Sequence, residues 1–239
     1  MKLLRISAVA LTVASLPGCA RGQEASLPVD AVHPRLLLTA RRLKLLRRER
    51  ERESLRWNQF HLLMAGKAPM PEPGFAEALY YQVSGDSAAG QHAVTWALGP
   101  GADLRQLALV FDWCQDILNE AQSKNLAAKL ARGIQQTRRD SSMAAVRSRL
   151  LAAVALAGHL PEVPEHEFAQ FHDWWESQIA PGLSEGRLPV ARYDVYALME
   201  ILHVVRDNLN MDLRDSAPRF FRDLATVQIL SYYPATYPA

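Results

Sequence analysis

Apolar residues recur every three or four positions along most of the chain, which is the spacing of amphipathic α-helices. In the segment 103–118, for example, Leu107, Val110 and Phe111 fall on one helical face. No segment alternates in the way that a half-buried strand does. We therefore predict an all-α protein of about nine helices, over 40–64, 75–83, 87–98, 103–118, 119–136, 141–158, 165–179, 191–208 and 218–230.

Short breaks separate these helices. The segment 65–74 carries three prolines and two glycines, and we expect loops there and at 181–189, with a turn at 161–164. Because each helix has one apolar stripe and short connections, neighbours must pack antiparallel. This pattern is compatible with a bundle, a solenoid or an α/α toroid.

The first residues are typical of an export signal. Lys2 and Arg5 precede an apolar stretch over 6–16 that is too short to span a bilayer as a stable anchor. A small residue, Gly18, comes directly before Cys19, as in the lipobox of bacterial lipoproteins. We interpret 1–18 as a lipoprotein-type signal peptide, Cys19 as the lipidated residue and 19–32 as a tether. A plain secretory signal is the alternative. The first interpretation predicts a lipid anchor in the periplasm or at the outer membrane.

The charge balance and the cysteine content argue against two classes of protein, nucleic-acid binders and zinc-cluster proteins. The chain holds 27 Lys+Arg and 25 Asp+Glu, and two of the basic residues lie in the signal segment. Such a balance argues against a globally basic nucleic-acid binder. Cys114 lies in an apolar run and is expected in the core. With two cysteines far apart, a zinc cluster has no support, and we expect neither a metal nor a cofactor.

The segment 41–56 is unusually basic, with eight Lys/Arg against three Glu. We expect a solvated helix face on which Glu49, Glu51 and Glu53 pair with neighbouring arginines. A patch for anionic lipid or another polyanion is the alternative.

Several motifs follow one another in a recognisable order. His33-Pro34-Arg35-Leu36-Leu37-Leu38-Thr39 leads into a helix, and a second helix ends at Gly85-Asp86. Phe111-Asp112-Trp113 follows, and Glu185-Gly186 precedes Tyr193 and Tyr196. In this order, from about His33 to Arg222, the chain resembles the N-terminal helical domain of heparinase II/III-like and alginate-lyase-like polysaccharide lyases.

The resemblance implies a fold. It is an incomplete α/α toroid of antiparallel helical hairpins, which we place at 33–230. In this family a β-sandwich domain normally follows the toroid. The Tyr- and Pro-rich segment 231–239 is interpreted as a tail that links to such a domain.

The resemblance also implies a chemistry, β-elimination in uronate-containing glycans, and thus an anionic polysaccharide as partner. A base removes the proton beside the uronate carboxylate while a nearby group neutralises that carboxylate. Tyr193 and Tyr196 match the family's tyrosine position and are the candidates for proton transfer. The alternative is that both tyrosines pack in the core or rim. The candidates for substrate binding are Arg192, Glu185, Arg147, Trp174 and Trp175.

One departure from the family pattern weakens the case for catalysis. The family places an Asn- or His-containing motif at the start of the helix that matches 141–158, but 138–147 holds neither residue type. Arg147 or Arg149 is the candidate that could neutralise the uronate carboxylate instead. The sequence therefore leaves open a non-catalytic, glycan-binding exported lipoprotein, or a helical lipoprotein that contacts only other proteins.

Overall fold

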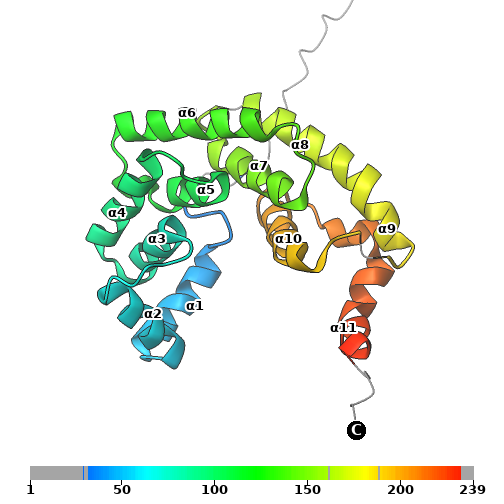
Figure 1. The fold of residues 1–239 in the computed structure, drawn as a ribbon, viewed down its shortest axis with the longest axis horizontal. Coiled ribbons are helices and arrows are strands. Elements are labelled where there is room, and N and C mark those ends of the chain that lie inside the picture. The colour runs from blue at the N-terminus through cyan, green and yellow to red at the C-terminus, as the bar shows by residue number, and fades with distance from the viewer. Residues whose placement is uncertain (1–28, 30–31, 161, 188, 233–239) are drawn as a thin grey trace, which may run out of the picture.

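The computed structural model describes residues 29, 32–160, 162–187 and 189–232. Within these residues the chain is all-helical and holds no strand, which confirms the predicted class (Figure 1). The α-helices are α1 (Ala40–Glu51), α2 (Leu55–Ala65), α3 (Pro73–Ser84), α4 (Ser87–Leu98), α5 (Leu104–Trp113), α6 (Glu120–Thr137), α7 (Met143–Leu156), α8 (Glu162–Trp174), α9 (Ala180–Ser184), α10 (Val195–Leu209) and α11 (Pro218–Tyr232). Shorter turns are the 3₁₀ segments η1 (Gln115–Ile117), η3 (Arg192–Asp194) and η4 (Leu213–Ser216), and the π-helical turn η2 (Trp175–Ile179).

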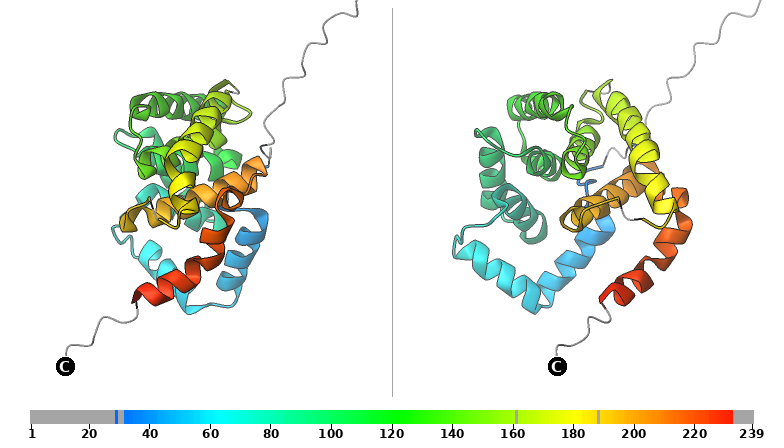
Figure 2. Two further views of the ribbon diagram at one scale, coloured as in Figure 1. Left: turned by 90° about the vertical axis from the view of Figure 1, so that its right-hand side faces the viewer. Right: turned by 45° about the vertical axis from the view of Figure 1, so that its right-hand side comes forward.

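The helices form two rows. Helices α3, α5, α7 and α10 make the first row, in which each packs on the next. Helix α4 packs on α3 and α5, α6 on α5 and α7, and α8 on α7. Figure 1 shows the rows as an arc, with α1 and α2 at one end and α11 at the other. Figure 2 shows the helices from two further sides.

Helices α5 and α7 form the centre of the core. From Leu107 to Cys114 every residue of α5 and its cap is buried, and so is every residue of α7 from Leu150 to its end. Helices that are apolar on all sides are buried in this way. Burial raises the pKa of the Cys114 thiol to about 12. The prediction of a buried core cysteine is confirmed.

Capping residues determine where several helices begin. Thr39 accepts from the backbone amide of Arg42 at 3.5 Å, and Asn119 forms a capping box with Gln122. The prediction of one helix over 40–64 is wrong. Glu53 has a positive φ of 49°, and Ser54 caps a new helix by accepting from the amide of Trp57 at 3.3 Å.

Other predicted boundaries also need correction. The predicted loop 181–189 overlaps the short helix α9, and the predicted turn 161–164 already contains the first turn of α8. The predicted helix 103–118 ends at Trp113 and continues as η1. Proline caused the first two errors, because it breaks helices but is well tolerated in their first turn.

The first and third sequence motifs pack against each other. Asp112 is fully buried and accepts from the backbone amides of Arg35 at 2.9 Å and Leu36 at 2.8 Å. His33 Nδ1 lies 2.6 Å from the same carboxylate, and Trp113 Nε1 donates to the Leu36 carbonyl at 2.9 Å. These residues therefore fix the entry segment onto α5 and have a structural role.

Candidate functional site

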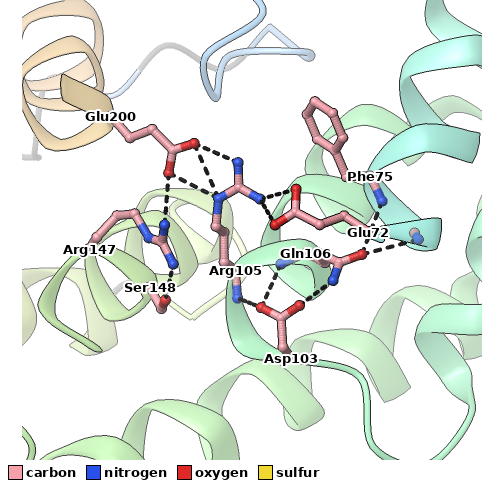
Figure 3. Close-up of polar contacts among 9 residues, drawn as sticks. Glu72, Phe75, Asp103, Arg105, Gln106, Arg147, Ser148 and Glu200 are labelled. Carbon is pink, nitrogen blue, oxygen red and sulfur yellow. Dashed lines mark hydrogen bonds and ion pairs between the residues drawn. The ribbon is translucent and has the colours of Figure 1, made fainter. Parts of the chain in front are cut away.

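The N-terminal ends of α3, α5, α7 and α10 meet around Arg105 (Figure 3). The Arg105 guanidinium donates through Nη1 to both oxygens of Glu72, at 2.9 Å each, and through Nε to Glu200 Oε2, also at 2.9 Å. Planar guanidinium groups favour such paired contacts with carboxylates. Arg105 is 8% exposed, and its charge is balanced by both glutamates.

The chain around Arg105 is fixed by helix caps. Asp103 accepts from the backbone amides of Arg105 at 3.0 Å and Gln106 at 3.2 Å, which caps α5. Gln106 Oε1 accepts from the amides of Gly74 and Phe75 at the start of α3. The Arg105 guanidinium also lies 5.5 Å from the centre of the Phe75 ring. Arg105 is thus held rigidly.

Arg147 on α7 is the less satisfied cation of this site. Its Nη1 lies 3.4 Å from Glu200 Oε2, and its buried Nε has no hydrogen-bond partner among the described residues. Burial lowers the pKa of Arg147, the nearby Glu200 opposes this effect, and the charge of Arg105 adds to it. The carboxylates of Asp103 and Glu72 also oppose the lowering, so Arg147 has acidic neighbours but no close paired contact of the kind that Arg105 makes.

Burial also lowers the pKa of Arg105, but the hydrogen bonds and charges of Glu200 and Glu72 outweigh that effect, so the pKa is raised. The two arginines consequently differ. Arg105 forms close ion pairs with Glu72 and Glu200. Arg147 also pairs with Glu200, but its nitrogen–oxygen distance is longer.

The predicted tyrosines lie at the start of α10. Tyr193 is in η3 and Tyr196 is in the first turn of α10, and they are 83% and 84% exposed. The alternative that both pack in the core or rim is wrong. Tyr196 precedes Glu200 by four residues, so both lie on one face of α10. Glu200 pairs with Arg147 across the helices, whereas Tyr196 extends into solvent one turn earlier and forms no hydrogen bond with a described residue.

Of the two predicted tryptophans, Trp175 cannot stack on a sugar. It is fully buried, and its Nε1 donates to Ser216 Oγ at 2.9 Å. Trp174 packs against the edge of the core, with its ring centre 6.0 Å from that of Phe171. Trp174 is half-buried and lines a hollow of about 600 Å³. The other lining residues include Asp173, Gln178, Ala191 and Asp194.

Glu185, a further predicted residue, is not brought into the Arg105 network. Glu185 is exposed and pairs with Arg187, whose Nε lies 2.9 Å from Glu185 Oε2. Arg192 belongs to η3, but its side chain lies outside the described residues, as do Cys19, the signal segment and most of the tail. In the described part of the chain, no helix is both long and apolar enough to cross a membrane, and no three metal-binding side chains group together.

Sequence reasoning missed Arg105, Glu72 and Glu200. A signal was present, because Arg105 and Glu200 are single charges within apolar helical runs, where an unpaired charge is costly. Opposite charges of this kind on two apolar helices indicate a buried ion pair. No protein-family model matches the sequence, and no curated protein matches it.

Proposed function

We propose that the described helices form an incomplete α/α toroid of a polysaccharide lyase-like protein that acts on uronate-containing glycans. The alternation of packing between the row α3, α5, α7, α10 and the row α4, α6, α8 supports this fold. The proposed glycan site lies where the N-terminal ends of α5, α7 and α10 come together. The observation that carries the proposal is that Arg147 pairs with Glu200 on α10, the helix that also carries the exposed Tyr196 one turn earlier.

Each group has a role in binding. Positive ends of helix dipoles converge at this end, and they favour an anion there. Arg147, whose side chain is 19% exposed, is the cation proposed to bind the uronate carboxylate. Trp174 lines a neighbouring hollow and offers a ring face on which a further sugar can stack. Arg105 is a positioning residue that fixes Glu200.

The reaction implied by the resemblance is β-elimination. Arg147 neutralises the uronate carboxylate, which makes the proton on the adjacent carbon acidic. Tyr196 or Tyr193, as its phenolate, accepts that proton and becomes a neutral phenol, the electron pair forms a carbon–carbon double bond, and the glycosidic carbon–oxygen bond breaks. The leaving oxygen takes up a proton from a tyrosine or from water.

A second candidate function is glycan binding without catalysis. Two observations favour it: Arg147 already faces Glu200, and the start of α7 offers neither Asn nor His. Binding needs only the exposed rings and a cation. For either candidate, we propose export and a lipid anchor at Cys19, with the protein in the periplasm or at the outer membrane.

The test uses the full chain with a panel of uronate polymers and a neutral glucan. Elimination is followed by the ultraviolet absorbance of the unsaturated uronate product, and binding by calorimetry. The double variant Tyr193→Phe/Tyr196→Phe is compared with the control Tyr81→Phe. Tyr81 lies on α3, and its hydroxyl donates a hydrogen bond to Asp116.

The lyase proposal expects product from wild type and Tyr81→Phe, and none from the double variant. Binding without product, little changed in the double variant, supports the second candidate. Absence of binding to every uronate polymer contradicts both.

A further inference from the structure

The outer side of α1 and α2 carries a surface that neither candidate function uses. Four residues of α1, Arg41, Lys44, Leu45 and Arg48, lie on one face at helical spacing, and Arg52 at the C-cap continues that face. All five are exposed. We call this stripe, together with the exposed face of α2, the α1–α2 outer face.

This face points away from the rest of the protein. On the opposite side of α1, Arg47 Nε donates to the Gln82 carbonyl at 3.2 Å, and Arg50 Nη1 donates to the Val83 carbonyl at 2.7 Å. These carbonyls lie at the end of α3. On α2, Trp57 and Phe60 pack on the Tyr80 ring of α3. Figure 2 shows α1 and α2 as consecutive segments along one edge of the molecule.

The cations of the outer face are not neutralised. None of Arg41, Lys44, Arg48 and Arg52 forms an ion pair with a described residue. The expected pairing of the three glutamates with neighbouring arginines is also wrong, because no ion pair of Glu49, Glu51 or Glu53 occurs within the described ranges. Four positive charges therefore face solvent together, and they outnumber the exposed Glu51 at the edge of the same stripe.

Large apolar side chains lie among these charges. Leu45 is 51% exposed on α1, and on α2 the exposed fractions are 73% for Leu55, 70% for Leu62 and 47% for Leu63. The leucines of α2 recur at helical spacing, on the side opposite the rings that pack on Tyr80. Exposed apolar residues grouped in this way mark interaction surfaces.

We propose that the α1–α2 outer face docks on an anionic phospholipid bilayer. Arginine and lysine at this surface are attracted to lipid phosphates, and the leucines enter the boundary between headgroups and acyl chains. A soluble polyanion would account for the cations but gives no reason for four exposed leucines. The docking surface lies on different helices from Arg147 and Tyr196, so docking does not depend on glycan binding.

The test is flotation of the full chain with vesicles of phosphatidylcholine, with and without phosphatidylglycerol. Every protein carries Cys19→Ser, so that no acyl chain contributes. The charge variant is Arg41→Gln/Lys44→Gln/Arg48→Gln/Arg52→Gln. Its control removes the same charge from exposed sites on other helices: Lys124→Gln/Arg132→Gln/Arg139→Gln/Arg219→Gln. The apolar variant Leu45→Ser/Leu62→Ser is compared with Met211→Ser/Ile229→Ser.

We expect binding that needs phosphatidylglycerol, weakens with salt, and falls at least about tenfold in the charge variant but not in its control. The apolar variant also loses binding, and its control does not. The proposal is overturned if the charge variant binds like its control. It is also overturned if dextran sulfate binds as tightly as the vesicles and the leucine changes have no effect. Circular dichroism of each variant separates loss of folding from loss of docking.

Discussion

The buried carboxylate of Asp112 accepts a hydrogen bond from the backbone amide of Leu36, 76 residues earlier in the chain, at 2.8 Å. The same carboxylate also accepts from the Arg35 amide and lies beside His33 Nδ1. One side chain on α5 thus fixes the segment that enters the first helix.

Replacement of Asp112 by alanine is expected to lower the free energy of unfolding by about 3–5 kcal/mol, because it leaves several buried donors without an acceptor. Urea unfolding measures the loss. The control is Glu120→Ala, which removes an exposed ion pair with Lys124 and should change stability by less than about 1 kcal/mol. Equal effects of the two changes would show that Asp112 does not anchor the entry segment.

The effects of substituting Arg105 and Glu200 on the free energy of unfolding should not be additive. Arg105→Gln leaves Glu200 half-paired in a largely buried site, and Glu200→Gln leaves both arginines short of negative charge. A double-mutant cycle by urea unfolding is expected to give a coupling energy of about 1–3 kcal/mol. The pair Arg105 and Glu120, which lie on different helices and share no contact, serves as control and should be additive. Additive effects of Arg105 and Glu200 would argue against the network in Figure 3.

Two glycines differ in what a methyl group would meet. A Cβ on Gly74 would lie 2.3 Å from the Trp96 ring, whereas one on Gly133 would meet only the end of the Leu104 side chain, at 2.7 Å. Gly74→Ala is therefore expected to cost about 1–3 kcal/mol through overpacking. Gly133→Ala lies inside α6, where better helix propensity of up to about 1 kcal/mol offsets the shift of Leu104. Thermal unfolding distinguishes them, and equal midpoints would contradict the packing of α3 on α4.

Stability should fall at mildly acidic pH because of His203. Burial lowers the pKa of His203, and the charges of Arg42 and Arg206 lower it further. Its Nδ1 lies 3.1 Å from Arg42 Nη2 and 2.9 Å from Arg206 Nη2, so it accepts hydrogen bonds only while it is neutral. The unfolded chain binds this proton more readily than the folded chain. The contribution of neutral His203 to the free energy of unfolding is therefore fully present at pH values well above the ordinary pKa of 6.5. It is lost as pH falls below that value.

The measurement is the free energy of unfolding between about pH 8 and about pH 5 for wild type and His203→Gln. The wild type should lose more stability over this range than the variant. His172→Gln changes an exposed histidine and should behave like the wild type. A pH profile that is the same with and without His203 would refute this assignment.

Much of the fold could be predicted from the sequence, because the 3.6-residue period of apolar positions is a local signal. The predicted helix starts at 40 and 119 agree with the observed caps Thr39 and Asn119, because capping is also a local interaction. The break between α1 and α2 could not be predicted in this way. It depends on Ser54 acting as a cap within a run that has no proline or glycine, and Ser54 alone is a weak signal.

The site was predictable only in part. Tyr193 and Tyr196 were chosen from their position after Glu185-Gly186, and the structure places both on the surface. The meeting of Arg105 with Glu200 joins residues 95 positions apart, which no local pattern reveals. Trp174 and Trp175 could not be told apart, since the register of the π-helical turn decides which ring enters the core.

The most direct measurement of the central claim is calorimetric binding of a uronate oligosaccharide to the full chain and to Arg147→Gln. The matched control is Arg132→Gln, an exposed arginine on α6. The account predicts that the wild type binds the uronate oligosaccharide but not its neutral counterpart. It also predicts that Arg147→Gln weakens binding at least about tenfold, equivalent to about 1.4 kcal/mol, while Arg132→Gln does not. Equal affinity for charged and neutral sugars, or equal loss in the two variants, would contradict it.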